Sequence, residues 1–270
     1  MRVPFFYGWV VALGGAVSAS FVLGSNQFAL STFLVPMEEE LGWPRSVFFG
    51  ALSVRYLLAG MLGPIVGPWA DGVHAPRLIL PVGVVLLSGS LAAVKGIDDP
   101  TSFLLLYGVV GAVGAALLHL QFWEAIVLKW FVRKRARALV VSNIGEASGP
   151  MIFPIAITLL VALVGWRDAW FIYGAITLLV LMPFTLLVRT RPEQLGQTID
   201  GMALHDDSPS EQRPLPNSMQ RSDAVRTKSF WLLAGAFTVT GLSITGFQSQ
   251  WIPHFRDVGF DATAAASAVA

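Results

Sequence analysis

Apolar residues gather in seven long stretches along the chain, most of them separated by short polar loops. They cover residues 7–36, 46–70, 78–94, 102–128, 138–164, 169–188 and 230–252. Each is close to or above the roughly 20 residues that a helix needs to cross the hydrocarbon of a bilayer. Because lipid offers no partner for backbone N–H and C=O groups, such stretches must be helical. The pattern therefore predicts an all-α integral membrane protein.

The composition supports this class. Hydrophobic residues make up 54% of the chain and charged residues 13%, whereas soluble domains carry about 25% charge. Cysteine is absent, which excludes disulfides and thiolate metal sites within the chain. The sequence shows no glycine-rich nucleotide loop, metal-ligand spacing or catalytic triad. We therefore expect neither an enzyme nor an ATP-driven pump, and no cofactor, metal, nucleotide or nucleic acid.

Charge alternates between the loops. With an inside N-terminus, thirteen of the 18 lysines and arginines fall on the inner side, four fall outside, and Arg55 lies within a span. The loop 129–137 alone carries five of them. Positive charge concentrates in cytoplasmic loops, so we predict a multi-pass plasma or inner-membrane protein with a cytoplasmic N-terminus. Loops 71–77 and 129–137 then lie inside, and loop 38–45 lies outside.

The chain divides into three parts. Residues 1–189 hold six spans in close succession, and residues 190–229 form a polar stretch rich in Pro, Ser, Asp and Arg. This stretch cannot bury enough apolar surface to fold alone, so it is predicted to be a flexible cytoplasmic linker. Residues 230–270 hold the seventh span and the start of an eighth. This order is typical of transporters built from two six-span halves, and predicts a six-helix bundle followed by the opening of a second half.

Polar side chains divide the spans into two groups. The third and sixth spans carry no charged residue, whereas the first, second, fourth, fifth and seventh carry polar or ionisable residues. Polar groups within a bilayer face a bundle interior or a water-filled cavity, so the five polar spans are expected to line a cavity. The tryptophans near span ends are interpreted as interfacial anchors. They are Trp9, Trp43, Trp130, Trp166 and Trp170.

Five short stretches resemble motifs of one known family. They are Phe-Tyr-Gly-Trp at 6–9, Gly-Pro-Trp-Ala-Asp at 67–71 followed by Arg77, Trp-Phe with a basic cluster at 130–137, Gly-Glu-Ala-Ser-Gly-Pro at 145–150, and Arg-Pro-Glu-Gln-Leu-Gly at 191–196. In this order the chain resembles the major facilitator superfamily, and within it the branch of monocarboxylate transporters and oxalate/formate antiporters. The resemblance implies secondary transport, by alternating access, of a small organic anion coupled to a proton or a counter-anion.

The stretch at 67–71 resembles the signature loop that follows the second helix in this superfamily. The resemblance implies a gating role for Gly67, Asp71 and Arg77. The loop departs from the family pattern at Gly72 and His74, where a basic residue and a glycine are usual.

The stretch at 145–150 is similar to the fifth-helix motif linked with antiporters. Here the motif is carried by Gly145, Gly149 and Pro150. Its downstream paired glycines are missing, because Ile152 and Phe153 stand near that place. The spacing of Gly145 and Gly149 also suits close packing between helices.

Arg55 is the most informative residue within a span. It lies about 13 Å from the outer end of the second span, at 1.5 Å per residue. An arginine near the midplane is costly, and its planar guanidinium suits a carboxylate bidentately. We interpret Arg55 as an anchor for an anionic substrate. The alternative is a structural arginine paired with Glu146, Glu124 or carbonyls at a helix end.

The first and fourth spans carry further polar candidates. Asn26, Gln27, His119 and Gln121 could bind a polar substrate, or could instead join neighbouring helices by hydrogen bonds. His119 could also carry a coupling proton, since an imidazole titrates near neutral pH.

Two carboxylates complete the set of candidates. Glu146 must be paired or protonated within a span, so it is a candidate proton site or a packing charge, with Asn143 on the same helical face. Glu124 lies shortly before Lys129 and is expected to pair with the basic loop.

Together these observations predict a secondary transporter of a small, monocarboxylate-like organic anion. Its partners are the substrate, a coupling proton or counter-anion, and the lipid bilayer. One alternative is efflux of a drug-like or amphipathic compound by the same fold. The other is a truncated membrane protein that transports nothing.

Overall fold

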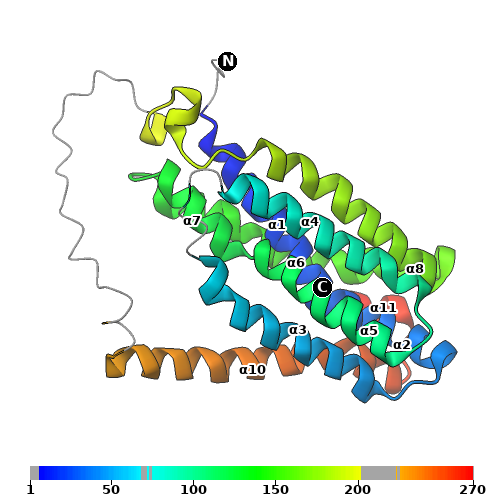
Figure 1. The fold of residues 1–270 in the computed structure, drawn as a ribbon. Helices are drawn as coiled ribbons and strands as arrows, with labels where there is room; N and C mark the ends of the chain where they lie inside the picture. Colours follow the sequence, from blue (N-terminus) through cyan, green and yellow to red (C-terminus); the bar gives the residue numbers. More distant parts are fainter. Residues whose placement is uncertain (1–5, 68–71, 73–74, 202–222, 224–225, 270) are drawn as a thin grey trace.

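The computed structural model describes residues 6–67, 72, 75–201, 223 and 226–269. These residues form helices joined by turns, with no strand among them. Most of the helices pack side by side into an elongated bundle (Figure 1). The all-α class is therefore confirmed for this part of the chain.

The first predicted span is a continuous helical path with a π-helical turn inside it. α1 (Gly8–Leu23) leads into η1 (Gly24–Phe28) and then into α2 (Ala29–Leu41). α2 ends at Gly42, whose φ of 65° is in the left-handed region that suits glycine. α3 (Arg45–Val66) follows and covers most of the second predicted span.

The third and fourth predicted spans differ in continuity. α4 (Ala75–Ala93) runs into a short 3-10 turn, η3 (Val94–Gly96). The fourth span consists of several pieces, which are α5 (Pro100–Phe103), η4 (Leu104–Val110), α6 (Gly111–Leu117) and α7 (Leu120–Trp130). The break between α6 and α7 was not predicted, because no proline or glycine marks it.

The fifth and sixth predicted spans lie within α8 (Arg135–Leu187). The backbone leaves the helical region at Gly165 (φ 78°, ψ 165°), so α8 is two helices joined there. Both termini of α8 lie at the same end of the bundle: Trp130, just before α8, donates its Nε1–H to the carbonyl of Arg189, just after it, at 2.8 Å. The two predicted spans are therefore antiparallel.

The bundle is built around contacts of α1 and α4 with α8. α1 also packs against α7, α4 against α6, and α3 against η4 and α6. Gly145 and Gly149 of α8 face the carbonyl groups of Ala16 and Ser20 on α1. A methyl group at Gly145 would overlap the Ala16 carbonyl, so the missing side chain permits the close approach. This supports the packing interpretation of the two glycines.

Four helical stretches in the described part are long and apolar enough to cross a membrane. They are Arg45–Val66, Pro76–Gly96, Pro100–Trp130 and Arg135–Leu187. α10 (Lys228–Asp257), which covers the seventh predicted span, is not one of the four. It runs at an angle to the bundle along the lower edge of Figure 1, and α11 (Ala262–Val269) follows it. The number of seven spans stays a prediction.

The stretch predicted as a flexible linker begins with ordered structure. It contains η5 (Pro192–Leu195) and η6 (Ile199–Gly201). Gln197 Oε1 accepts the backbone N–H of Tyr7 at 3.0 Å, at the start of α1. Pro192 is buried. The structure differs from the prediction over residues 190–201, because the bundle supplies an apolar surface that this stretch lacks by itself.

Three of the tryptophans interpreted as interfacial anchors are buried inside the protein. Trp130 and Trp170 have no exposed surface, and Trp166 is 4% exposed. Trp170 stacks on Phe33 of α2, with ring centroids 4.0 Å apart. These rings therefore hold helices together, and the interfacial interpretation is wrong for them.

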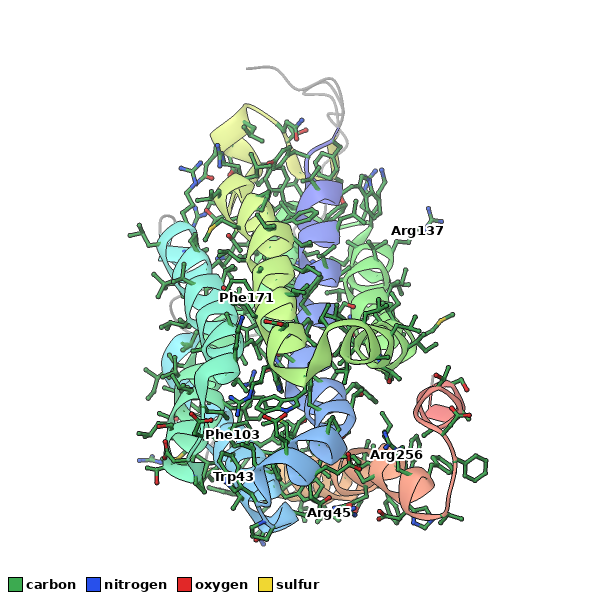
Figure 2. All side chains as sticks on the ribbon, turned by 90° about the vertical axis from the view of Figure 1, so that its right-hand side faces the viewer. Trp43, Arg45, Phe103, Arg137, Phe171 and Arg256 are labelled. Atoms are coloured by element: carbon green, nitrogen blue, oxygen red, sulfur yellow. The ribbon has the colours of Figure 1, made fainter. Side chains whose placement is uncertain are left out.

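The two ends of the bundle are named here by one arginine each. We call the end with Tyr7, Trp130 and the basic loop the Arg133 end, and the opposite end the Arg167 end. Trp43, Arg45 and Phe103 lie together at the Arg167 end (Figure 2).

Candidate functional site

A cavity of about 610 Å³ lies between α3 and the junction of α6 with α7. Its polar lining comes from Tyr56 on α3 and from His119 and Gln121 at the junction. The other residues that line it are small or apolar, and none of the described ones is acidic. The cavity therefore lies between the second and fourth predicted spans, two of the five that were expected to line one.

The break in the fourth span forms one wall of this cavity. His119 leaves the helical region (φ −57°, ψ 145°), and α7 begins after it. Ser18 Oγ on α1 donates to the Leu118 carbonyl at 3.0 Å, which satisfies an acceptor left free at the end of a helix. His119 Nδ1 and Trp123 Nε1 are buried without a hydrogen-bond partner in the described part of the chain. Interrupted helices of this kind are typical of transport sites.

Arg55 does not line the cavity, although its neighbour Tyr56 does. Its side chain is fully buried. Nη1 donates to the Tyr107 carbonyl at 2.9 Å, and Nη2 donates to Ser25 Oγ at 3.3 Å. The guanidinium carbon lies 4.4 Å from the centre of the Tyr107 ring. The carbonyl, the hydroxyl and the ring are neutral groups that stabilise the cation.

Arg55 joins two π-helical segments, η1 and η4. Ser25 belongs to η1 and Tyr107 belongs to η4, and Tyr107 Oη also donates to the Ser25 carbonyl at 3.0 Å. π-turns are frequent at functional sites. Asn26 and Gln27 belong to η1 as well, but their side chains lie outside the described residues, and their substrate role stays a prediction.

Glu124 does not pair with the basic loop as expected. Asn143 Nδ2 donates to Glu124 Oε1 at 2.8 Å and so links α7 to α8. Glu146 lies one helical turn beyond Asn143, on the same exposed side of α8. The structure therefore gathers two carboxylates and an amide on the fourth and fifth spans.

The predicted gate is described only in part. Asp71 lies outside the described residues. Gly67 lines the cavity. Arg77 Nε donates to the Val188 carbonyl at 3.4 Å, which joins the start of α4 to the end of α8. A pairing of Asp71 with Arg77 stays a prediction.

One polar cluster at the Arg133 end was not predicted. The carboxylate of Asp200 accepts the backbone N–H groups of Val132, Arg133 and Lys134, at distances from 2.7 to 3.3 Å. Asp200 is 5% exposed, and its φ of 60° is unusual for a residue with a side chain. Because the three N–H groups precede α8, Asp200 caps this helix from 66 to 68 residues away in the sequence. Because Asp200 is so far from α8 in the sequence, no local pattern of residues could have predicted this helix cap.

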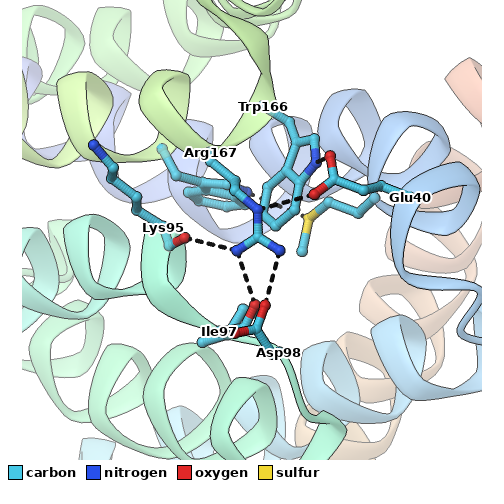
Figure 3. A network of polar contacts seen from close by, with 8 residues as sticks. Glu40, Lys95, Ile97, Asp98, Trp166 and Arg167 are labelled. Atoms are coloured by element: carbon cyan, nitrogen blue, oxygen red, sulfur yellow. Dashed lines mark hydrogen bonds and ion pairs between the residues drawn. The ribbon is translucent and has the colours of Figure 1, made fainter.

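A second unpredicted cluster lies at the Arg167 end (Figure 3). Arg167 donates to Glu40 Oε1 at 3.0 Å and to Asp98 Oδ1 at 2.9 Å. It also donates to the carbonyls of Lys95 and Ile97, at 2.9 and 3.1 Å. One guanidinium therefore joins the end of α2, the turn after α4 and the break in α8. All three segments separate predicted spans, and the first belongs to loop 38–45, which was predicted to lie outside; this shared side was the available signal.

Glu40 receives a second hydrogen bond in this cluster, from Trp166 Nε1 at 2.6 Å (Figure 3). The bonds from Arg167 and then Trp166 hold the pKa of the Glu40 carboxyl below its ordinary value. The reason is that both donors stabilise the ionised form.

These features define a class of protein. An α-helical membrane bundle with interrupted helices, a buried charge and a cavity beside it is typical of secondary transporters. Among the described residues, no group of His, Asp and Glu could hold a metal ion. Residues 16–270 match the family model of the Major Facilitator Superfamily, so the chain belongs to this superfamily. The family is one of transporters and not of enzymes, as the resemblance implied.

Several curated relatives are distantly similar. The chain is 25% identical over 191 residues to monocarboxylate transporter 14 of Mus musculus, covering 70% of this chain and 36% of that protein. It is 29% identical over 197 residues to the MFS-type transporter pytF of Aspergillus terreus, covering 71% and 65%. It is 23% identical over 239 residues to a probable L-galactonate transporter of Escherichia coli, covering 87% and 51%. The chain spans between about one third and two thirds of the length of these relatives.

Proposed function

We propose that the chain forms part of a secondary transporter that moves a small organic anion by alternating access. The observation that carries this proposal is Arg55, a fully buried cation that donates to the Tyr107 carbonyl and whose neighbour Tyr56 lines the cavity. Charges act more strongly through a low-dielectric interior than through water. Arg55 therefore makes the cavity favourable for an anion. The absence of acidic residues in the described lining supports the same substrate class.

The polar groups of the cavity are the proposed substrate contacts. His119 and Gln121 supply them at the break in the fourth span, and Asn26 and Gln27 of η1 are further candidates. A carboxylate substrate is consistent with two relatives, one named a monocarboxylate transporter and one a probable L-galactonate transporter.

Coupling to a proton is the second part of the proposal. Glu146 is the proposed proton carrier, and Glu124 and Asn143 lie on the adjoining helical surface. His119 is the other candidate. A counter-anion is the alternative coupling partner. It is suggested by the antiporter-like motif, which is carried by Gly145, Gly149 and Pro150.

The remaining parts of the proposal concern gating and topology. Gly67, Asp71 and Arg77 form the proposed inner gate. We propose a cytoplasmic N-terminus in a plasma or inner membrane, with residues 1–189 as one half, 190–229 as the connection and 230–270 as the start of the next half. The grouping of predicted inner loops at the Arg133 end and predicted outer loops at the Arg167 end supports this orientation.

Uptake of labelled carboxylates into proteoliposomes, with and without a pH gradient, tests the function. Arg55→Lys keeps the charge but loses the planar fork that bonds Tyr107 and Ser25, so the buried charge is no longer held in place and substrate affinity should fall. Arg55→Gln removes the charge that acts on the cavity and should lower the affinity further. Arg191→Gln, which removes an exposed arginine, is the matched control. A stable Arg55→Gln protein with unchanged carboxylate affinity would contradict the proposal.

A second candidate is efflux of an amphipathic compound. Most residues that line the cavity are apolar or small. One relative is named a Fujikurins efflux protein, from Gibberella fujikuroi, and is 30% identical over 155 residues, covering 57% of this chain and 34% of that protein. Including neutral amphipathic compounds in the uptake panel separates the two: transport of these, unaffected by Arg55→Gln, would favour efflux.

A further inference from the structure

Residues 226–269 meet the helical bundle at its Arg167 end. They contact it through α10, which lies against α2 and η1, and through α11, which lies against α8. Ile252 and Pro253 are the buried residues among those of α10 whose side chains are described. The start of α10 lies apart from the bundle (Figure 1). α10 is therefore buried against the bundle only near its C-terminal end.

Arg45 forms an ion pair across this contact. It is the first residue of α3, and its Nη1 and Nη2 donate to the two carboxylate oxygens of Asp257, the last residue of α10, at 2.7 and 2.8 Å. Two parallel bonds of this kind are the strongest contact between an arginine and a carboxylate. Among the described residues, no other ion pair joins residues 226–269 to the rest of the chain. Figure 2 shows Arg45 at this end of the bundle.

A second carboxylate binds the same guanidinium from within the bundle. Arg45 Nε donates to Glu38 Oε2 at 2.9 Å, and Glu38 lies on α2, just before α3. Because Glu38 and Arg45 belong to neighbouring elements of the bundle, their pair persists if α10 moves away. The pair with Asp257 breaks when α10 moves away. Arg45 therefore keeps a counter-charge in both arrangements, and only its bonds to Asp257 depend on the contact with α10.

The contact itself contains polar groups and is incompletely filled. A cavity of about 180 Å³ lies between α2, α8, α10 and α11. Its lining includes the hydroxyl groups of Thr32 and Thr158 and the charged side chains of Glu39 and Arg256. Parts of a chain that meet through a small, polar contact are expected to move relative to each other, whereas a large apolar contact would hold them together. This contact therefore suits repeated closing and opening.

We infer that Arg45 and Asp257 form an outer gate, which holds the seventh predicted span against the first and second spans while the Arg167 end is closed. The inference rests on the proposed function, because alternating access requires this end to open. On opening, Asp257 leaves and Glu38 retains Arg45. The side chains of Arg45 and Asp257 are 35% and 50% exposed, so their pair contributes modestly. A modest contribution biases an equilibrium between two states without fixing one of them.

The reactivity of a single cysteine measures the opening, since the chain has no cysteine of its own. Thr32→Cys places a thiol on α2 in the cavity beside the gate, where Thr32 is 9% exposed. In the detergent-solubilised full chain, a neutral maleimide should label this thiol slowly, at a rate set by the open population. In this background, Asp257→Asn and Arg45→Gln should each raise the rate about three- to fivefold, as the loss of a partly exposed ion pair allows.

Two further variants separate a gate from a general loss of stability. Arg45→Glu/Asp257→Arg reverses the ion pair and should return the labelling rate toward that of Thr32→Cys alone, with the same melting temperature. Lys95→Gln/Asp168→Asn is the matched control, because this pair lies at the same end but within the bundle. It should leave the labelling rate within about twofold.

Two results would overturn the inference. An unchanged labelling rate in Asp257→Asn would mean that the ion pair does not hold the contact closed. An equal rise in Lys95→Gln/Asp168→Asn would mean that the loss of any ion pair loosens this end. The assay contains no substrate, so it separates the gate from the proposed substrate: a chain that fails to take up carboxylates can still show the changes in labelling.

Discussion

At the residue scale, Arg55 shows how a charge can be retained inside a membrane bundle. The cost of placing an arginine near the midplane is offset by a carbonyl, a hydroxyl and the face of an aromatic ring, from Tyr107 and Ser25. Each of these three groups is neutral and stabilises the cation by its dipole or its ring electrons. The same contacts join η1 to η4, and a change at Arg55 therefore affects both the potential of the cavity and the packing of two spans.

A substitution at Gly111 tests the packing around Arg55 and leaves the charge of Arg55 unchanged. A methyl group at Gly111 would overlap the Arg55 guanidinium, so we expect Gly111→Ala to destabilise the protein by about 1–3 kcal/mol, as overpacking usually does. Thermal unfolding in detergent measures this. Gly89→Ala is the control, because no heavy atom lies within 4 Å of the added methyl group. Equal melting temperatures in the two variants would show that Arg55 can move aside freely.

Asp200 stabilises a helix that is distant from it in the sequence. Its carboxylate caps α8, so Asp200→Ala should lower stability by about 0.5–2 kcal/mol, the usual effect of losing a helix cap. Glu193→Ala removes an exposed carboxylate from η5 and should have little effect. The melting temperatures of the two variants are the measurement. A loss that is the same for both would assign the effect to net charge.

At the element scale, the break in the fourth span is the feature that builds the cavity. An uninterrupted helix would not present His119 and Gln121 at a junction. The break persists because α1 supplies a donor for the Leu118 carbonyl through Ser18. The stability of one interrupted helix therefore depends on a hydroxyl of another.

Ser18→Ala should leave the Leu118 carbonyl buried without this donor, at a cost of about 1–3 kcal/mol. Ser53→Ala is a matched control, because Ser53 Oγ is exposed and bonds only one turn back, to the Phe49 carbonyl. Thermal unfolding compares the two. A Ser18→Ala protein as stable as Ser53→Ala would show that water or another group replaces the hydroxyl.

Glu40 links three elements at the Arg167 end, and its contribution should depend on pH. Its pKa is lowered in the folded protein by Arg167 and Trp166, so the ionised carboxylate stabilises the fold. This stabilisation is present above the ordinary glutamate pKa of about 4.3 and is lost as pH falls through the lowered folded value. We expect the wild-type melting temperature to decline more steeply below about pH 4 than that of Glu40→Gln.

Glu39→Gln serves as the control for this measurement, because Glu39 is the exposed neighbour of Glu40. It should retain the steep decline of the wild type. Parallel curves for wild type and Glu40→Gln would contradict the assignment.

At the scale of the whole molecule, the described loops separate into two ends with different polar chemistry. At the Arg167 end, Arg45, Lys95 and Arg167 pair with carboxylates, whereas Arg133, Lys134, Arg135 and Arg137 of the basic loop form no ion pair within the described part of the chain. The proposed orientation places the Arg133 end inside the cell, where anionic lipids and the positive-inside rule favour it.

Cysteine labelling tests this orientation directly, since the chain has no cysteine of its own. Glu39→Cys and Lys134→Cys should react with an impermeant maleimide from opposite sides of the membrane, Glu39→Cys from outside. Both positions are exposed, so lack of access does not limit the reaction. Labelling of both from the same side would exclude the proposed topology.

The sequence by itself determined the class of this protein and the approximate position of most helices. In lipid the backbone N–H and C=O groups of each apolar stretch must pair within that stretch. Its length and hydropathy are therefore enough to predict a membrane-spanning helix. The motifs at 67–71, 130–137 and 145–150 pointed to the superfamily, which the family match confirms. Candidate residues such as Arg55, His119 and Glu146 stood out because polar groups are rare within spans, but their partners could not be read from the sequence.

Only the tertiary structure decided those partners. Arg55 contacts a carbonyl and a hydroxyl in other spans, Glu124 contacts Asn143 instead of the basic loop, and Asp200 caps a helix that begins 65 residues earlier. The break at His119 depends on a hydroxyl of α1. Each of these contacts joins segments far apart in the chain, and such pairings depend on how the helices pack together, which no local pattern of residues contains.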